Sequence, residues 1–278
     1  MNPYKILEPT VISFSGGRTS AYMLYKVLEA HDGKLPEEAI VVFANTGKEE
    51  EETLKFVKAC SDNWNVKIHW VEYQFAEKPS DRWKEVDFET ASRNGEPFMA
   101  MIHESTGYLP NPVARICTAY LKIRTIHNFL KAKGWKHNEN MDWVGIRADE
   151  QRRAAKIARE RTPLVVDGVT KETVGNFWKS QPFDLGLPNM NGVTMHGNCD
   201  LCYLKPVHQI VSLIKEKPSR ADWWIEAEKS VQTSNKTFGD GDRFRKDRPS
   251  YAELKKFALS QQDMFDTSEE AIPCFCGD

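Results

Sequence analysis

The chain has 278 residues, of which 40% are hydrophobic and 28% are charged, and its formal net charge is −2. This composition is typical of a soluble globular protein with one large domain, or one domain and a substantial extension, and the near-neutral charge gives no reason to expect general nucleic-acid affinity. No stretch approaches the ~18 apolar residues of a membrane span, and residues 1–6 lack the apolar core of a signal peptide, so we expect a cytoplasmic protein without a membrane partner.

Apolar runs alternate with helical patterns through the first half of the chain. Strands are predicted at residues 11–14, 39–44, 66–72 and 142–146, and helices at 19–31, 50–60 and 117–133, whereas residues 76–112 show no regular pattern. The run 39–44 is continuously apolar, as expected of a strand buried on both faces. This alternation predicts an α/β fold with right-handed βαβ units and a Rossmann-like parallel sheet.

The pattern changes at about residue 187. Loop-like residues come first, then helices are predicted at 206–216, 220–231 and 250–262, and the chain ends Cys-Phe-Cys-Gly-Asp. We therefore predict a nucleotide-binding α/β domain at residues 1–186 and a helical, cysteine-bearing C-terminal region at residues 187–278.

A glycine-containing loop joins the first predicted strand to the first predicted helix. It reads Ser15-Gly16-Gly17-Arg18-Thr19-Ser20. The glycines can turn their N–H groups inward beside the free N–H groups of the first helical turn, and the hydroxyls add donors. The spacing is not that of the P-loop. The pattern predicts a cradle for phosphate or pyrophosphate; the alternative is a Gly-Gly turn before an ordinary helix.

The second predicted strand is followed by Asn45, Thr46 and Gly47. Ligands of parallel α/β sheets bind at the carboxyl ends of the strands. Backbone and hydroxyl groups here can reach a ribose or an adenine, although a plain strand-to-helix turn would also explain the segment.

A basic segment begins at the end of the predicted strand 142–146 with Gly145-Ile-Arg147. Arg147 and Arg153 can clamp a phosphate or sulfate in a bidentate manner. Asp149 and Glu150 can orient these arginines or hold Mg²⁺. Surface ion pairing is the alternative. The segment continues with further cations, which form either a basic patch or a solvated helix face: Arg152, Lys156, Arg159 and Arg161.

Five of the six cysteines fall in three clusters. Cys117 opens a helix beside cations, which favours a thiolate. The pairs Cys199–Cys202 and Cys274–Cys276 suggest a metal site, because disulfides are disfavoured in the cytosol. Cys60 is predicted to be a core residue.

Together these motifs resemble the phosphoadenosine phosphosulfate (PAPS) reductase family of the PP-loop, or adenine nucleotide α-hydrolase-like, superfamily. The motifs in chain order are Ser-Gly-Gly-x-x-Ser, Asn-Thr-Gly, Cys-Thr-x-x-x-Lys, Gly-Ile-Arg-x-x-Glu and Cys-x-x-Cys. The resemblance implies an adenine nucleotide over the strand tips. Residues 15–20 would surround its phosphates, residues 45–47 would lie near its ribose or base, and Arg147 would face its anionic group.

Cluster-bearing members of the family have a Cys-Cys pair, a long spacer and then Cys-x-x-Cys. Cys117 and Cys199 are separated by 199 − 117 = 82 positions, which fits, but residue 116 is Ile. The family's catalytic Glu-Cys-Gly-Leu-His tail is also replaced. Cys274 or Cys276 would then fill the catalytic role or supply the missing ligand.

The five clustered cysteines are compatible with two different metal sites. In the first, Cys117, Cys199, Cys202 and one of Cys274 and Cys276 hold a [4Fe–4S] cluster. In the second, Cys199, Cys202, Cys274 and Cys276 hold a structural zinc ion. The spacing from Cys117 to Cys199 favours the cluster.

Three functions follow. The first is reduction of a sulfonucleotide, PAPS or adenylyl sulfate, with Cys117, Arg147 and Cys276 as catalytic residues and a thioredoxin-like reductant as partner. The second is an ATP pyrophosphatase that uses ATP with Mg²⁺ to adenylylate and thiolate tRNA or DNA. The third is a nucleotide-sensing subunit without catalysis. The sequence leaves open whether the chain forms a homo-oligomer.

Overall fold

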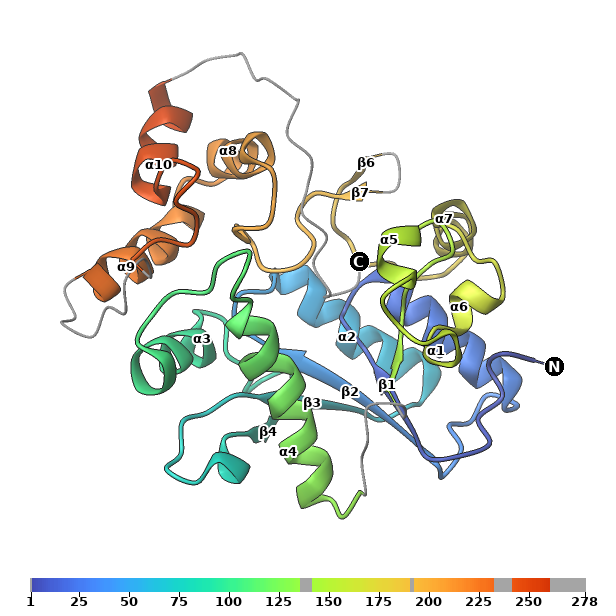
Figure 1. Cartoon of the computed structure of the whole chain (residues 1–278). Coiled ribbons are helices and arrows are strands. Elements are labelled where there is room, and N and C mark those ends of the chain that lie inside the picture. Colours follow the sequence, from blue (N-terminus) through green and yellow to red (C-terminus); the bar gives the residue numbers. More distant parts are fainter. Residues whose placement is uncertain (1, 136–141, 191–192, 233–241, 261–278) are drawn as a thin grey trace.

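The computed structural model describes residues 2–135, 142–190, 193–232 and 242–260 (Figure 1). The strands are β1 Thr10–Ser13, β2 Ala39–Asn45, β3 Ile68–Glu72, β4 Lys84–Val86, β5 Asp142–Val144, β6 Asn189–Met190 and β7 Val193–Thr194. The α-helices are α1 Arg18–Ala30, α2 Glu51–Trp64, α3 Glu96–Ala100, α4 Thr125–Ala132, α5 Gln151–Ala154, α6 Pro163–Val166, α7 Lys171–Lys179, α8 Val207–Glu216, α9 Arg220–Gln232 and α10 Tyr251–Ser260. Short 3₁₀ helices are η1 Pro79–Asp81 and η5 Arg159–Arg161, and π-helical segments are η2 Met101–Thr106 and η3 Thr118–Arg124.

Five strands form one sheet in the order β4-β3-β2-β1-β5. The pairs β1–β2, β2–β3 and β1–β5 are parallel, and the short edge strand β4 is antiparallel to β3. All seven residues of β2 are buried, as its apolar run predicted. The α/β fold with a Rossmann-like, mostly parallel sheet is therefore confirmed.

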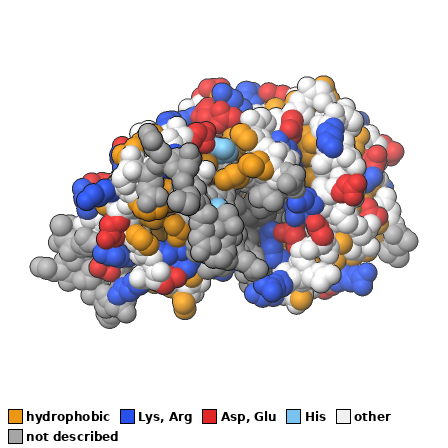
Figure 2. Space-filling model, turned by 90° about the horizontal axis from the view of Figure 1, so that it is seen from above, with side chains coloured by type: hydrophobic (Ala, Val, Ile, Leu, Met, Phe, Trp, Pro, Cys, Tyr) orange, Lys and Arg blue, Asp and Glu red, His pale blue; other side chains and the backbone are white. Residues whose placement is uncertain are grey.

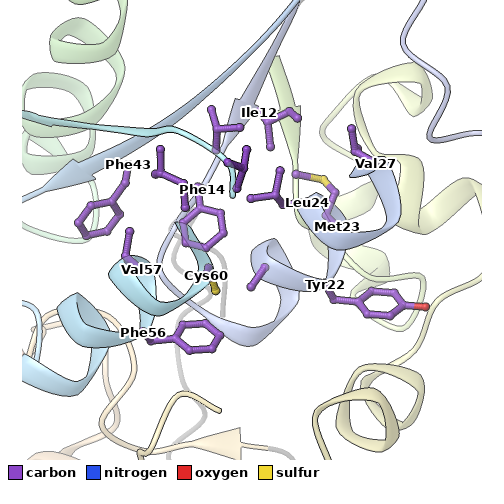
Figure 3. Close-up of a cluster of buried hydrophobic side chains, with 14 of the residues drawn as sticks. Ile12, Phe14, Tyr22, Met23, Leu24, Val27, Phe43, Phe56, Val57 and Cys60 are labelled. Atoms are coloured by element: carbon purple, nitrogen blue, oxygen red, sulfur yellow. The ribbon is translucent and has the colours of Figure 1, made fainter. Parts of the chain in front are cut away.

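Side-chain alternation along β1 separates two cores. Ile12 and Phe14 point into the core formed with α1 and α2, where they meet residues such as Leu24 and Val57 (Figure 3). Val11 faces the opposite side of the sheet, which α4 covers. Successive residues of a strand point to opposite faces, so the strand serves both layers.

A third core joins the C-terminal helices to the α/β region. Trp224 of α9 is fully buried, and its ring centroid lies 5.1 Å from that of Tyr251 of α10. Phe98 of α3 and Leu121 of η3 belong to the same core. Helices α8, α9 and α10, which Figure 1 shows in orange and red, therefore pack on segments that precede residue 187 by many positions.

Several short elements differ from the sequence-based expectation. Residues 76–112, expected to be irregular, contain β4, α3 and η2. The helix expected over residues 117–133 is π-helical in η3 before it continues as α4. Three helices, α5 to α7, lie between residues 151 and 179, where no element was predicted. In the ranges that the structure describes, no helix has both the length and the apolar character needed to cross a membrane.

Candidate active site

The order of the strands defines where a ligand site should lie. β1 has β2 on one side and β5 on the other, so the direction of the chain across the sheet reverses between β1 and β5. In open α/β sheets, ligands bind at the carboxyl ends of the strands at such a switch point. Gly145 follows β5 there, and a Cβ on this glycine would lie 2.9 Å from the Cα of Ser20. Glycine thus allows the end of β5 to approach α1 closely.

The loop after β1 has the form of an anion cradle. Gly16 has a φ of +81°, a conformation that favours glycine, and Gly17 is the N-cap of α1. The N–H of Ser15 donates to Oγ of Ser20 at 3.1 Å, and the two hydroxyl oxygens lie 2.9 Å apart. These bonds fix the loop, while Gly17 has no side chain to cap the N–H groups of the first turn. Such groups are suited to bind an anion.

A pocket lies over this loop. Its lining includes Ser15, Gly16, Gly17, Arg18, Thr19, Glu49, Thr53, Lys122, Arg147 and Lys171. We call it the anion pocket because the cradle and three further cations border it.

Arg147 is held at the edge of the anion pocket. Its Nη1 donates to Oγ1 of Thr19 at 3.0 Å, and its Nε donates to Asp149 at 3.1 Å. Its backbone N–H donates to Glu150 at 2.9 Å, and Glu150 also pairs with Nη1 of Arg153. Nη1 of Arg147 also lies 3.7 Å from this carboxylate, so Glu150 pairs with two guanidinium groups.

Arg153 faces a second cavity. This cavity has a volume of about 380 Å³ and lies between the sheet face formed by β1, β2 and β5 and the segments η3, α4 and α5. Its floor is formed by small and apolar side chains, among them Val11, Val42 and Ala44. Nε of Arg153 is buried and has no hydrogen-bond partner within the described residues. The volume is in the range of small-molecule sites.

The two sites are adjacent. Ser15 and Lys122 line both the anion pocket and this cavity.

Residues 45–47 are placed differently from the other expected nucleotide ligands. Among the described residues, neither the anion pocket nor the cavity is lined by Asn45, Thr46 or Gly47. Asn45 is fully buried and donates from Nδ2 to Glu72 at 2.6 Å and to the carbonyl of Ser92 at 2.8 Å. The end of β2 is thus held by hydrogen bonds to other residues of the protein.

Arg18 also has a partner inside the protein. Its Nε and Nη2 donate to the two carboxylate oxygens of Asp184, each at 2.7 Å, and Nη1 donates to Thr194 at 3.0 Å. This bidentate pair ties α1 to the segment that closes the far side of the anion pocket. Several pocket residues were not singled out from the sequence, among them Glu49, Thr53, Lys122 and Lys171. Only Lys122 stood in a recognised motif.

Three of the candidate sulfur ligands lie in one core. Sγ of Cys117 is 3.4 Å from the hydroxyl of Tyr203, and the N–H of Cys202 donates to the carbonyl of Cys199 at 3.2 Å. All three cysteines pack in the core of the C-terminal helices, whereas Cys60 is buried in the core of α1 and α2. Cys274 and Cys276 lie outside the described residues.

The Cys199 thiol lies beside the anion pocket. Oγ1 of Thr46 is 3.5 Å from Sγ of Cys199 and 2.9 Å from the carboxylate of Glu49. Burial and the charge of Glu49 raise the pKa of the Cys199 thiol well above its ordinary value, while Lys122 opposes this shift. Burial likewise raises the pKa of the Glu49 carboxyl. A nearby positive charge is therefore needed to favour the Cys199 thiolate.

Thiolates suit zinc or an iron–sulfur cluster. Within the described ranges, however, no three His, Cys, Asp or Glu side chains are placed together so that they could hold one metal ion. A complete site would need further ligands or a rearrangement of the loop at residues 199–202.

Comparison with known proteins places these motifs in a family. A search of curated proteins finds the "Uncharacterized nin region protein ORF290" of Escherichia phage lambda, which is 29% identical over 213 residues, covering 74% of this chain and 70% of that protein. No solved structure matches. The family model described as the phosphoadenosine phosphosulfate reductase domain matches residues 9–169, more than half of the chain. Proteins of this family are typically enzymes, and their PP-loop corresponds to the cradle after β1. The chain belongs to the phosphoadenosine phosphosulfate reductase domain family.

Proposed function

We propose that the protein is an enzyme that binds an adenine nucleotide and carries out sulfur chemistry on it, namely reduction of a sulfonucleotide. The observation that carries this proposal is the proximity of Cys199 to the anion pocket. Thr46 contacts both the Cys199 thiol and Glu49, and Glu49 lines that pocket. Sulfur ligands and an anion cradle from distant parts of the chain are thus neighbours.

The two adjacent cavities suggest how the nucleotide lies. The adenosine would occupy the cavity above Val11, Val42 and Ala44, where flat apolar surface suits a purine. The anionic tail would pass Ser15 and Lys122 into the cradle. Arg147 and Lys171 would then complement its charge, since both line the anion pocket.

The reduction would proceed in two steps at sulfur. A thiolate attacks the sulfur of the sulfonucleotide; an S–S bond forms, the S–O bond breaks and the adenosine phosphate leaves. The thiolate is that of Cys276 if Cys274 completes the [4Fe–4S] cluster, or that of Cys117 if the two cysteine pairs hold zinc. A thiol of the thioredoxin-like partner then attacks the cysteine sulfur, which releases sulfite and forms a mixed disulfide. The second thiol of that partner would reduce the mixed disulfide. Such chemistry requires a reducing compartment such as the cytoplasm.

A metal centre is part of the proposal. Cys117, Cys199 and Cys202 would provide thiolates for a [4Fe–4S] cluster, together with Cys274 or Cys276. A zinc ion held by the two cysteine pairs is the alternative. The packing of Cys117 in the same core as Cys199 and Cys202 supports the cluster. Its positive iron ions would favour thiolates beside the buried Glu49 carboxyl.

The second candidate is an ATP pyrophosphatase that modifies a nucleic acid. Exposed arginines beside the cavity, including Arg152 and Arg159, favour it. In this reaction an acceptor oxygen attacks the α-phosphorus of ATP, the bond to the β-phosphate oxygen breaks, and pyrophosphate is released into the cradle. Mg²⁺ would accompany the ATP.

Calorimetric titration with AMP, ATP, adenylyl sulfate and PAPS tests the shared nucleotide site. We expect at least one of these ligands to bind, and Arg147→Ala to weaken its binding about tenfold or more, whereas Arg147→Lys should lose less because it retains the charge. Thioredoxin-dependent sulfite release would support reduction. AMP and pyrophosphate formed from ATP would support the second candidate. Absence of binding by all four would overturn the nucleotide site.

A further inference from the structure

We propose that the two rims of the cavity form a docking surface for the phosphate backbone of a nucleic acid. The cavity rims are residues 151–161 on one side and η3 on the other, because both segments contribute side chains to the cavity wall. This inference deepens the second candidate function, which names a nucleic acid as the acceptor, and rests on it for the class of partner; its contacts are separate from those of the anion pocket.

The first rim carries unpaired guanidinium groups. Arg152 and Arg159 are exposed, and within the described part of the chain neither side chain has a hydrogen-bond or ion-pair partner. Some other exposed cations among the described residues are paired, for example Lys58 with Asp62 at 2.9 Å, whereas others such as Lys34 and Lys55 are not; the rim differs from them in that its cations are clustered. Residues 147–161 hold six basic and three acidic residues, a net +3 in a chain of net −2. Positive charge is therefore concentrated on this rim.

The second rim combines a cation with ring and apolar surface. Arg124 is exposed, and its guanidinium carbon lies 4.2 Å from the ring centroid of Tyr120. The adjacent Ile123 is 47% exposed and lines the cavity. Cations beside aromatic and apolar side chains are the usual composition of surfaces that hold single-stranded nucleic acid.

The cavity between the rims is also basic. Arg153 and Arg161 come from the first rim and line the cavity, and the buried Nε of Arg153 has no partner among the described residues. Figure 2 shows the face seen from above, on which blue Lys and Arg side chains lie near a hollow together with red Asp and Glu side chains. A phosphate backbone that crosses both rims would place a base or a strand end at the mouth of the cavity.

Nucleic acid fits this surface better than an acidic protein does. Guanidinium groups bind phosphate in a bidentate, planar geometry, and the rim side chains Arg124, Arg152 and Arg159, which have no ion-pair partner among the described residues, are all arginines. Carboxylates also pair with guanidinium groups, so the preference for nucleic acid rests on the cavity between the rims, whose volume of about 380 Å³ can take up a base.

The test compares two variants that lose the same charge. The rim variant is Arg124→Gln/Arg152→Gln/Arg159→Gln. The control is Lys34→Gln/Lys55→Gln/Lys67→Gln, three exposed lysines on the α1–β2 connection, on α2 and before β3, away from the cavity. Binding is measured by fluorescence anisotropy with labelled single-stranded DNA, duplex DNA and an RNA hairpin, at KCl concentrations from about 50 to about 200 mM.

We expect the wild type to bind at least one of these nucleic acids with an affinity that falls as salt rises. Each phosphate contact contributes about 0.7 to 0.9 to the slope of log K against log salt, so the rim variant should lose about 2 to 3 from that slope. The control should keep the wild-type slope. The nucleic acid that binds most tightly shows which type of nucleic acid the rims hold.

Three results would overturn the docking surface. They are failure of the wild type to bind any of the three nucleic acids at about 50 mM KCl, an equal loss in the control variant, and equally tight binding of polyglutamate. AMP titrations of both variants separate the two proposals. Retained AMP binding with lost nucleic-acid binding supports the rims, whereas nucleic-acid binding without any mononucleotide binding would remove the nucleotide site and leave the rims intact.

Discussion

The ammonium of Lys48 lies 3.0 Å from a carboxylate oxygen of Asp200, and both side chains are almost wholly buried. Lys48 follows the tip of β2, and Asp200 lies between Cys199 and Cys202. The N–H of Asp200 donates to the carbonyl of Lys48 at 2.8 Å, and Trp224 donates to Asp200 at 2.9 Å. This ion pair therefore ties the cysteine loop to the edge of the sheet that carries the anion pocket.

The first prediction concerns this ion pair. Lys48→Met leaves the Asp200 carboxylate buried without its countercharge, which should lower the free energy of unfolding by about 3–5 kcal/mol. Lys48→Met/Asp200→Asn should recover much of that loss, because Asn has no charge and keeps an oxygen for Trp224. Urea unfolding of the three proteins measures both effects. Equal stability of the single and double variants would show that the charge pair is unimportant.

Gly16 provides the second prediction. At its φ of +81° an alanine is strained, by about 1–2 kcal/mol, and the added Cβ would lie 2.7 Å from Cγ2 of Thr53. Gly16→Ala should therefore lower both the thermal stability and the nucleotide affinity. Thr53→Ser removes Cγ2, so Gly16→Ala/Thr53→Ser should regain part of the stability.

Gly17→Ala is the matched control for Gly16→Ala, because both variants add one Cβ to the loop after β1. The φ of −99° at Gly17 suits any residue, so Gly17→Ala should weaken anion binding, through the Cβ added at the cradle, with little loss of stability. Scanning fluorimetry and calorimetric titration of both variants distinguish the two roles. If Gly16→Ala and Gly17→Ala have the same effect on stability, the backbone assignment of Gly16 is wrong.

Much of the fold could be predicted because its main elements have strong local patterns. The buried run of β2 and the cradle before α1 are short-range features, and both appear where the sequence indicated. By contrast, β4 and α5 have three and four residues, too few to show a periodicity. Their positions depend on tertiary contacts, such as the antiparallel pairing of β4 with β3.

The same distinction applies to the candidate site. Ser15 and Arg147 could be placed because each follows a predicted strand. Asn45 also ends a strand, but its side chain turns to Glu72, a neighbour that only the sheet register brings near. Lys171 enters the anion pocket from α7, far along the chain, and no local pattern indicates this.

The third prediction concerns pH. Burial raises the pKa of Glu228 from 4.5 to about 6, and the side chain accepts a hydrogen bond from the N–H of Tyr251 at 3.0 Å. Because the pKa is higher in the folded protein, the folded state binds more protons between these values, and stability should fall as the pH rises from about 4.5 through about 6. The cost at neutral pH is about 2 kcal/mol.

Glu228→Gln removes that cost and keeps an acceptor for Tyr251. The variant should therefore be more stable than the wild type by about 1–2 kcal/mol at neutral pH, and the difference should vanish below pH of about 4.5. Glu226→Gln, an exposed position on the same helix, is the control and should have little effect. A Glu228→Gln gain that is constant with pH would contradict ionisation as the cause.

The fourth prediction separates the two metal centres. Cys202→Ser should remove the metal in either case, because Cys202 is a ligand of both the [4Fe–4S] cluster and the zinc ion. Cys60→Ala, in the core of α1 and α2, should retain it.

Cys117→Ser distinguishes the two metal centres. It should abolish the iron and the visible absorbance of a cluster, but should leave a zinc ion bound by the two cysteine pairs. Elemental analysis of protein purified without oxygen gives the metal content of each variant. Metal retained by Cys202→Ser would exclude Cys202 from the ligand set, and a cluster retained by Cys117→Ser would make the proximity of Cys117 to Tyr203 a packing contact alone.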